Sequence, residues 1–384
     1  MNSIEILSRL IAFNTVSANS NMELMDYISN LLLENGIHST LLPNEDASKA
    51  NLYATIGDHN KAGVMLSGHT DVVPVEGQDW TKPAFELTQE DGKLFGRGTA
   101  DMKGFIASAI SAAIDASKRD LKTPLHLAFS YDEEIGCVGV HSMIDMLADA
   151  PVRPAMCIIG EPTSLSVAVG HKGKTAMRAT CIGREGHSAL APFAMNALHL
   201  GCDLASEIRD MQSDLAKNGE RDSDYDVPYT TLHVGKINGG VALNIVPNLC
   251  VVDFEIRNIA ADDPLVILEE IKTRAAKIVE TARSHAPEAD IKIEIFNTYP
   301  GLNTATDTQV VKFVKSLSGA NGTNKVAFGT EGGLFSGKLG IPTVVCGPGS
   351  MTQGHKPDEY VEVEQLSRCD DMLATLVDRL EAGL

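Results

Sequence analysis

The sequence lacks any run of apolar residues long enough to cross a bilayer, although 43% of its 384 residues are hydrophobic. This composition is typical of a soluble globular protein. The first segment, MNSIEILSRLIAFNTVS, also lacks the basic start and the continuous apolar core of a secretory signal. We therefore expect a cytoplasmic protein without a membrane partner.

Basic residues are scarce. The chain has 32 Lys and Arg against 51 Asp and Glu, which gives a formal net charge of −19. Phosphate binding needs clustered Lys and Arg, so this balance argues against a nucleic-acid partner. It is compatible with cationic or zwitterionic small substrates and with divalent metals, and equally with a charged surface that only keeps the protein in solution.

A disulfide pattern is also missing. The seven cysteines are odd in number, none are arranged as CxxC, and most lie in apolar surroundings. Buried, reduced thiols fit this usage better than disulfides or a sulfur metal site.

The length of the chain suits two domains. In the first part, short apolar runs typical of buried strands alternate with segments of helical periodicity. Such alternation predicts an α/β fold with a mostly parallel central sheet that is covered on both faces. The strands are expected at residues 51–57, 62–68, 125–131, 155–160 and, near the end of the chain, 341–347.

From about Thr175 the order of elements changes. Strand patterns at 175–183, 230–239, 248–258 and 291–300 combine with helical patterns at 196–217 and 264–283. The resulting order, β-α-β-β-α-β, is the ferredoxin-like pattern, which can stand as its own domain. We predict a discontinuous catalytic domain, residues 1–173 and 300–384, with an α+β domain inserted at 174–299.

Several acids and histidines lie where predicted strands end or helices begin. They are His69 and Asp71 in SGHTDVVP, Asp101 in GRGTADMKG, Glu133 and Glu134 in SYDEEIG, Glu161 in GEPT and His355 in GPGSMTQGHKPDEY. Because the carboxyl ends of parallel strands converge on one crevice, these side chains could meet in space. Any one of these motifs alone would fit a solvated loop. The GRGTADMKG glycines do not form a dinucleotide-binding GxGxxG.

Two imidazoles and three carboxylates match the needs of two divalent ions. We predict His69 and Glu161 on one ion, His355 and Glu134 on the other, and Asp101 bridging them. These ligand types favour Zn²⁺, with Co²⁺ and Mn²⁺ as alternatives. Two such ions at roughly 3.5–4 Å would polarise a scissile carbonyl and hold the attacking water.

Two acids in the set remain for other roles. Glu133 follows the strand beside a ligand and can take a proton from water held by the metals. Asp71, two residues after His69, is expected to accept the other ring N–H of that histidine and so fix its tautomer and orientation.

Together these segments resemble the signature segments of the acetylornithine deacetylase and succinyl-diaminopimelate desuccinylase family of two-metal amidohydrolases, relatives of carboxypeptidase G and aminoacylase. The resemblance runs through the whole chain. It implies the same five metal ligands, with Glu133 as the general base and a cis peptide at Asp101–Met102. It also implies a homodimer in which the inserted domain serves as lid and dimerisation surface.

Within the family, FGTEGGLFSG (328–337) and the late GHKPDEY segment most resemble acetylornithine deacetylases. The resemblance implies hydrolysis of N2-acetylornithine to ornithine and acetate, a step of arginine biosynthesis. Succinyl-diaminopimelate desuccinylation, and hydrolysis of another N-acyl amino acid or a dipeptide by an amidohydrolase or carboxypeptidase, stay open. A catalytically silent binding protein is a further alternative, against which the complete set of ligands and base speaks.

Four residues are candidates for holding the substrate. We expect Glu331 to recognise the cationic amine and Arg257 the carboxylate. An ordinary structural ion pair is the alternative for each. His187 in GREGHSA and Asn244 in GVALNIVPN match family positions that hold the substrate or its oxyanion. In the family this histidine often comes from the partner subunit, whereas Asn244 alone would also fit a turn cap.

Overall fold

The computed structural model describes residues 1–384, which divide into two compact units. Unit 1 comprises Met1–His171, Leu302–Val326 and Thr330–Leu384, and unit 2 comprises Lys172–Gly301 and Ala327–Gly329. The two main boundaries differ by two residues from the predicted 174 and 299. The short return of residues 327–329 to unit 2 was not predicted.

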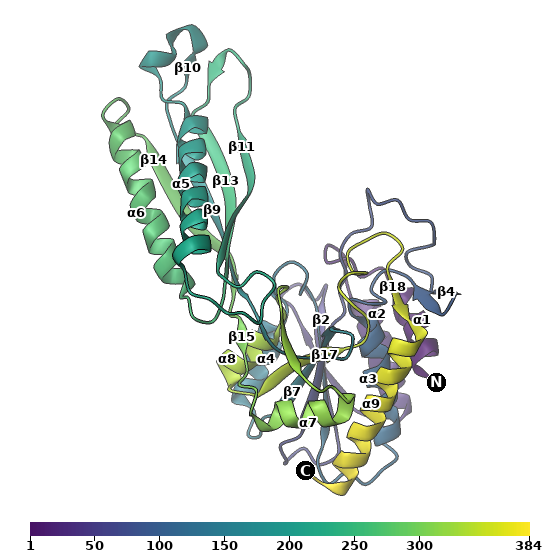
Figure 1. Ribbon diagram of the computed structural model, residues 1–384. Coiled ribbons are helices and arrows are strands. Elements are labelled where there is room, and N and C mark those ends of the chain that lie inside the picture. The colour runs from purple at the N-terminus through teal and green to yellow at the C-terminus, as the bar shows by residue number, and fades with distance from the viewer. The chain divides into compact units, whose positions relative to one another are not determined.

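Unit 1 is built on a nine-stranded sheet of order β1-β2-β6-β3-β7-β17-β8-β15, with β16 also paired to β8 (Figure 1). The strands are β1 (Ser39–Pro43), β2 (Ala50–Ile56), β3 (Val64–His69), β6 (Leu125–Ser130), β7 (Met156–Pro162), β8 (Val167–His171), β15 (Leu302–Asn303), β16 (Thr323–Val326) and β17 (Thr343–Gly347). In the last pairing, His171 of β8 lies opposite Leu302 of β15.

The direction of pairing changes across this sheet. The four strands β6, β3, β7 and β17 run parallel to their neighbours in this group. Towards one edge β1, β2 and β6 pair antiparallel, and towards the other β8 pairs antiparallel with both β17 and β15. The α/β fold is therefore confirmed with a mixed sheet: its centre is parallel, and its edges are antiparallel except for the parallel pair β8–β16. Strand β3 is buried along its whole length, as its apolar run requires.

Helices cover both faces of the sheet (Figure 1). On one face α1 (Ser3–Ile11), α2 (Met22–Glu34), α3 (Lys103–Ala116), α7 (Gln309–Ser318) and α9 (Val363–Ala382) share one hydrophobic core with the strands. On the other, α4 (His141–Asp149) and α8 (Gly332–Leu339) pack against each other. A small sheet of β4 (Thr88–Glu90), β5 (Lys93–Phe95) and β18 (Tyr360–Glu362) completes unit 1.

Unit 2 has its own antiparallel sheet, of order β11-β13-β9-β14, and its own core. Its elements are β9 (Gly173–Ile182), α5 (Ala197–Asn218), β11 (Thr231–Gly239), β13 (Leu249–Asn258), α6 (Pro264–Arg283) and β14 (Asp290–Tyr299). This chain order is the β-α-β-β-α-β pattern expected from the sequence. The first and last strands are neighbours, with Lys174 opposite Tyr299. A second small pair joins β10 (Gly186–His187) to β12 (Ile245–Val246), and a 3₁₀ turn follows at Ser188–Phe193.

All seven cysteines are free and six of them are buried, which confirms the prediction of unpaired thiols. Among the helices, none combines the length and the apolar character needed to pass through a membrane.

Candidate metal centre

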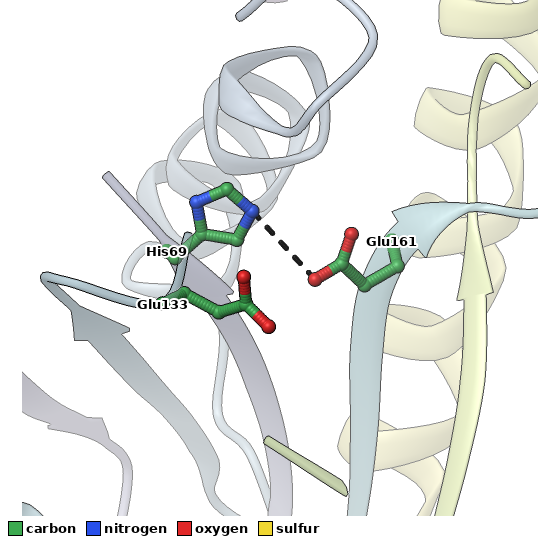
Figure 2. Close-up of side chains that lie close together, drawn as sticks. All are labelled: His69, Glu133 and Glu161. Carbon is green, nitrogen blue, oxygen red and sulfur yellow. Dashed lines mark ion pairs between the residues drawn. The ribbon is translucent and has the colours of Figure 1, made fainter. Parts of the chain in front are cut away.

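The predicted acids and histidines of unit 1 come together at the carboxyl ends of the parallel strands. His69 is the last residue of β3, and Glu161 lies near the end of β7. Glu133 lies just beyond β6, the strand on the other side of β3. In Figure 2 the carboxylates of Glu133 and Glu161 both face the His69 ring. Ligand atoms of these three residues lie within 4.8 Å of one another.

His69 occupies the buried half of the site. Its Nε2 lies 3.0 Å from Oδ1 of Asp101 and 3.6 Å from Oε1 of Glu161. Asp101 comes just before α3, so that helix brings its carboxylate to the end of β3. The Asp101–Met102 peptide bond is cis, which confirms the expectation from the resemblance.

His355 forms the other half of the site. It comes from the loop between β17 and β18, and its side chain is 47% exposed. Its Nε2 lies 3.1 Å from Oδ2 of Asp101 and 3.1 Å from Oε2 of Glu134. Asp101 thus turns one oxygen to each imidazole, and Glu161 lies beside His69 while Glu134 lies beside His355. Ligand atoms of Glu134 also lie within 4.8 Å of those of His69 and Asp101.

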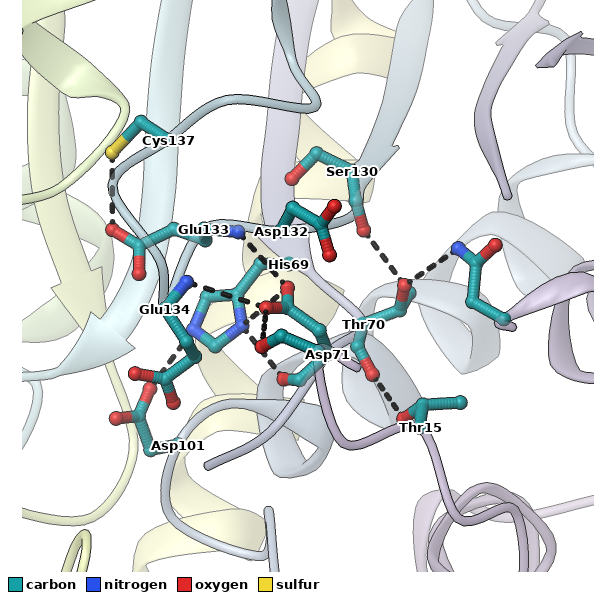
Figure 3. Close-up of polar contacts among 12 residues, drawn as sticks. Thr15, His69, Thr70, Asp71, Asp101, Ser130, Asp132, Glu133, Glu134 and Cys137 are labelled. Atoms are coloured by element: carbon teal, nitrogen blue, oxygen red, sulfur yellow. Dashed lines mark hydrogen bonds and ion pairs between the residues drawn. The ribbon is translucent and has the colours of Figure 1, made fainter. Parts of the chain in front are cut away.

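The carboxylate of Asp71 lies beside the ring of His69, as predicted, but it is not the nearest acceptor for the ring. The Nδ1 of His69 is 3.0 Å from the backbone carbonyl of Asp71 and 3.6 Å from its Oδ1 (Figure 3). The main chain of Asp71 is therefore the nearer acceptor for the ring. Its carboxylate instead accepts the backbone N–H groups of Glu133, at 3.1 Å, and Glu134, at 3.3 Å. The Oγ of Ser17 donates to it at 2.6 Å. Asp71 thus fixes the main chain that carries the predicted base and its neighbouring ligand.

The electrostatics of this cluster fit a divalent cation. Burial and the nearby Asp101 carboxylate raise the pKa of Glu134 to about 7 and that of Glu161 well above its ordinary value. Burial opposes protonation of His69, yet the Glu161 and Asp101 carboxylates raise its pKa well above the usual range. Without a cation, Glu134, Glu161 and His69 all hold protons more tightly than they do in water, so the cluster favours added positive charge. Divalent ions would supply the missing positive charge, and imidazole with carboxylate donors suits Zn²⁺ and its neighbours.

Glu133 differs from the ligands in its contacts. Its Oε1 accepts the S–H of Cys137 at 3.3 Å (Figure 3). Burial raises the pKa of Glu133 to about 8, and the Glu134 and Glu331 carboxylates add to the rise. A carboxylate that keeps a proton near neutral pH can both accept and return one.

The sequence places this arrangement in a known family. The model of the peptidase family M20/M25/M40 matches residues 65–379. The chain belongs to this family. With the donor set described above, this M20-family protein is a metal-dependent hydrolase.

Individual relatives agree with this membership. The chain is 33% identical to an acetylornithine deacetylase of Myxococcus xanthus, over 98% of this chain and 97% of the relative. Its fold resembles that of an M20-family metallo-carboxypeptidase from Sulfolobus solfataricus, with a TM-score of 0.81, 18% identity and 100% coverage of both chains. A dinuclear metal-binding M20 peptidase of Bacillus subtilis has a TM-score of 0.69 at 15% identity, covering 98% of this chain and 96% of that one.

The candidate substrate residues of unit 2 fall into two places. His187 in β10 lies opposite Ile245 of β12, and the carbonyl of Asn244 accepts the N–H of Ser188 at 3.0 Å. His187 and Asn244 are therefore close together, and both are exposed. The Nδ1 of His187 accepts the N–H of Ala189 at 3.1 Å.

Arg257 lies apart from this pair, in β13. Its Nε donates to Glu255 at 3.0 Å and its Nη1 to the hydroxyl of Tyr299 at 3.0 Å. An ion pair within unit 2, the alternative considered for this residue, is thus present. Glu331 of unit 1 precedes α8 and is buried, and its Oε1 has no hydrogen-bond partner.

Three supporting residues were not predicted: Ser17, Cys137 and Glu359. Ser17 and Cys137 contact Asp71 and Glu133 as described above, and Glu359 accepts the backbone N–H of Asp101 at 3.0 Å. The last two lie in segments already singled out, Glu359 in GHKPDEY and Cys137 just after SYDEEIG. Proximity to these motifs was the available signal, but it does not indicate which backbone or side chain each group contacts.

Proposed function

We propose that this M20-family protein hydrolyses N2-acetylornithine to ornithine and acetate, in the cytoplasm and as a step of arginine biosynthesis. The observation that carries the proposal is the joint presence of two features. One is similarity over nearly the full length to acetylornithine deacetylases. The other is the convergence of all five predicted ligands and a further carboxylate, Glu133, at one edge of the sheet.

In this proposal His69 and Glu161 hold one divalent ion, and His355 and Glu134 hold the other. Asp101 lies between them with one oxygen towards each histidine. Zn²⁺ is the favoured ion and Co²⁺ an alternative. When bound, the two ions would supply Lewis-acid polarisation of the amide carbonyl and a water of lowered pKa.

Glu133 carries the proton transfers. It takes a proton from the attacking water as the oxygen approaches the acetyl carbon, and it returns a proton to the leaving amine of ornithine. The Asp71 carboxylate serves this step indirectly, because it holds the backbone N–H of Glu133. The thiol of Cys137 contacts one oxygen of the Glu133 carboxylate and leaves the other for water.

Recognition of the two ends of the substrate is assigned to charged side chains. We propose that Glu331 recognises the side-chain amine and Arg257 the α-carboxylate. The unpartnered Oε1 of Glu331 supports the first assignment, because an ammonium group would satisfy it. The carboxylate of a substrate would have to share or displace the bond from Arg257 to Glu255.

For unit 2 the proposal is a combined role as lid and dimerisation surface. His187 and Asn244 would stabilise the oxyanion, with His187 supplied by the partner subunit. Large apolar side chains lie exposed around the β10–β12 pair, Phe193 at 78% and Val241 at 88%, and Leu243 is fully exposed. We call these three residues the exposed tip of unit 2. Exposed apolar groups of this kind favour burial against another surface.

The deciding experiment is a hydrolysis assay on metal-stripped protein reconstituted with Zn²⁺ or Co²⁺. N2-acetylornithine and succinyl-diaminopimelate are offered side by side, and Glu133→Gln is the control variant. We expect preference for acetylornithine that is lost in the stripped protein and in the variant. Preference for the succinyl compound would overturn the substrate and keep the chemistry. Absence of metal-dependent hydrolysis of any N-acyl substrate would favour a silent binding protein.

A further inference from the structure

Glu359 holds the turn that presents Asp101. Its carboxylate is 1% exposed and accepts four hydrogen bonds from residues 97–101. The Oε1 accepts the backbone N–H groups of Ala100 and Asp101, both at 3.0 Å. The Oε2 accepts the N–H of Gly98 at 3.1 Å and the Nη1 of Arg97 at 2.7 Å. A single buried side chain thus determines how this turn folds.

The backbone needs such an acceptor. Gly98 has φ +89°, a conformation that glycine adopts readily, and the turn directs several N–H groups inward. Buried N–H groups without a partner destabilise a fold, because they lose the hydrogen bonds that water gives them in the unfolded chain. The N–H of Asp101 belongs to the residue whose side chain bridges the two halves of the site. The hydrogen bond from that N–H to Glu359 therefore fixes the backbone position from which the Asp101 side chain extends.

Arg97 extends this contact to the loop of His355. It is 1% exposed, and besides Glu359 it donates to the carbonyl of Lys356 at 3.4 Å and, through Nη2, to Oε1 of Gln78 at 2.5 Å. The Nε2 of Gln78 donates to the carbonyl of His355 at 3.0 Å. A continuous chain of hydrogen bonds thus links the main chain at Asp101 with the main chain at His355.

The two halves of the site differ in what supports them. His69 and Glu161 belong to β3 and β7, neighbouring strands inside the sheet. Asp101 and His355 belong to loops, and the His355 side chain is about half exposed. The half built on strands is held by the sheet itself. The half that includes His355 depends on contacts between loops.

We propose that Glu359 and Arg97 are positioning residues that fix Asp101 relative to His355, and thereby allow the second divalent ion to bind beside the first. The inference rests on the proposed two-ion site, but not on the identity of the substrate. The role of both residues is to hold backbone groups of the Asp101 turn and the His355 loop, so neither needs to contact an ion or a substrate.

The test is a Co²⁺ titration of metal-stripped protein, followed by calorimetry and by the visible absorption of bound Co²⁺. We expect the wild type to bind two ions. Glu359→Gln should bind the first ion as the wild type does and the second about 10–100-fold more weakly, the usual loss when a partner of the metal ligands is changed. Arg97→Lys keeps the positive charge but loses the guanidinium group, whose two terminal nitrogens donate to Glu359 and Gln78. It should show the same selective loss of affinity for the second ion.

The matched control is Asp358→Asn. Asp358 is the adjacent carboxylate, but it accepts hydrogen bonds from Thr81 and Lys82 and makes none with residues 97–101. Both Co²⁺ affinities should stay unchanged in this variant. The inference is overturned if the wild type binds one ion, if Glu359→Gln and Arg97→Lys both bind two ions as the wild type does, or if they weaken both ions equally. A wild type that binds two ions but leaves acetylornithine intact would refute the proposed substrate and leave this inference standing.

Discussion

The candidate metal centre of unit 1 and the β10–β12 pair beside the exposed tip of unit 2 both contain imidazole groups, but in opposite situations. In the metal centre each imidazole is hydrogen-bonded to a carboxylate, and Asp71 and Glu359 hold the main chain around the ligands. At the tip His187 is exposed beside exposed apolar side chains. The first region is organised by contacts within its own unit. The second exposes an imidazole and apolar side chains, which a partner subunit would cover in the dimer proposed above.

The largest effect is expected from Glu133→Gln. The ligand atoms of Glu133, His69 and Glu161 lie within 4.8 Å of one another, so Glu133 has the position of either a base or a ligand. As the base, its loss should lower kcat about 10³-fold while two Co²⁺ ions still bind, because the ligands are intact. Steady-state kinetics and a Co²⁺ titration measure the two quantities. Loss of one bound ion would identify Glu133 as a ligand.

The next largest effect concerns His187. His187→Ala should lower kcat about 10²-fold if the imidazole stabilises an oxyanion. In a symmetric dimer with His187 acting across the interface, mixing this variant with Glu133→Gln should restore about a quarter of the wild-type activity, because each mixed dimer regains one complete site. Unfolding and refolding the two together allows the chains to exchange. No recovery in confirmed mixed dimers would mean that His187 acts within its own chain or not at all.

A smaller effect is expected at Glu331, whose titration makes the stability of the folded protein depend on pH. Burial raises the pKa of Glu331 to about 7 from an ordinary 4.5. The folded protein therefore binds more protons than the unfolded chain between these values, so stability falls as pH rises from 4.5 to 7. A shift of this size corresponds to about 3 kcal/mol. Glu331→Gln should remove this loss of stability with rising pH.

Urea unfolding of metal-stripped protein at pH 5 and pH 8 measures this loss of stability. Relative to the wild type, Glu331→Gln should gain stability at the higher pH and show little difference at the lower one. Glu364→Gln, at an exposed position of α9, is the control and should leave the difference unchanged. Equal responses of wild type and Glu331→Gln would mean that the Glu331 carboxylate is not titrating in this range.

The smallest effect is expected at Cys137. Its S–H bond to Glu133 is a weak one, so Cys137→Ala should lower kcat about two- to five-fold with KM unchanged. Cys137→Ser, which keeps a donor, should recover most of the loss. If serine behaves as alanine does, the thiol fills space rather than orienting the carboxylate.

The sequence predicted best what is buried in the parallel centre of the sheet. Strands such as β3 and β7 have both faces covered, so their residues form uninterrupted apolar runs that can be recognised locally. Edge strands such as β1 and β16 mix polar and exposed residues and were not predicted. Some antiparallel pairs at the edges, such as β8 with β15, join distant segments, and local patterns do not contain that information.

Prediction of the site had the same limits as prediction of the fold: local patterns were recognised, and long-range contacts were not. Residue types at strand ends were enough to predict that the five candidate ligands lie close together, because convergence follows from the sheet. The role of Asp71 was not recoverable from its spacing to His69, since its carbonyl and its carboxylate are equally near in sequence. Its carboxylate contacts the main chain of Glu133, 62 residues later, and Glu359 contacts Asp101 across 258 residues. Such contacts depend on the completed fold.

Two residue pairs mark the boundary of the insertion, and they bear on how this protein can be engineered. His171 lies opposite Leu302, and Lys174 lies opposite Tyr299. Paired antiparallel residues have Cα atoms about 4.5–5.5 Å apart, a gap that a two-residue turn can close. Residues 172–301, which make up unit 2 apart from residues 327–329, therefore form an insertion whose two ends lie side by side. It can be cut out and replaced by a tight hairpin turn without stretching the remaining chain, and the excised segment brings its own adjacent ends to any host that offers a similar pair of strands.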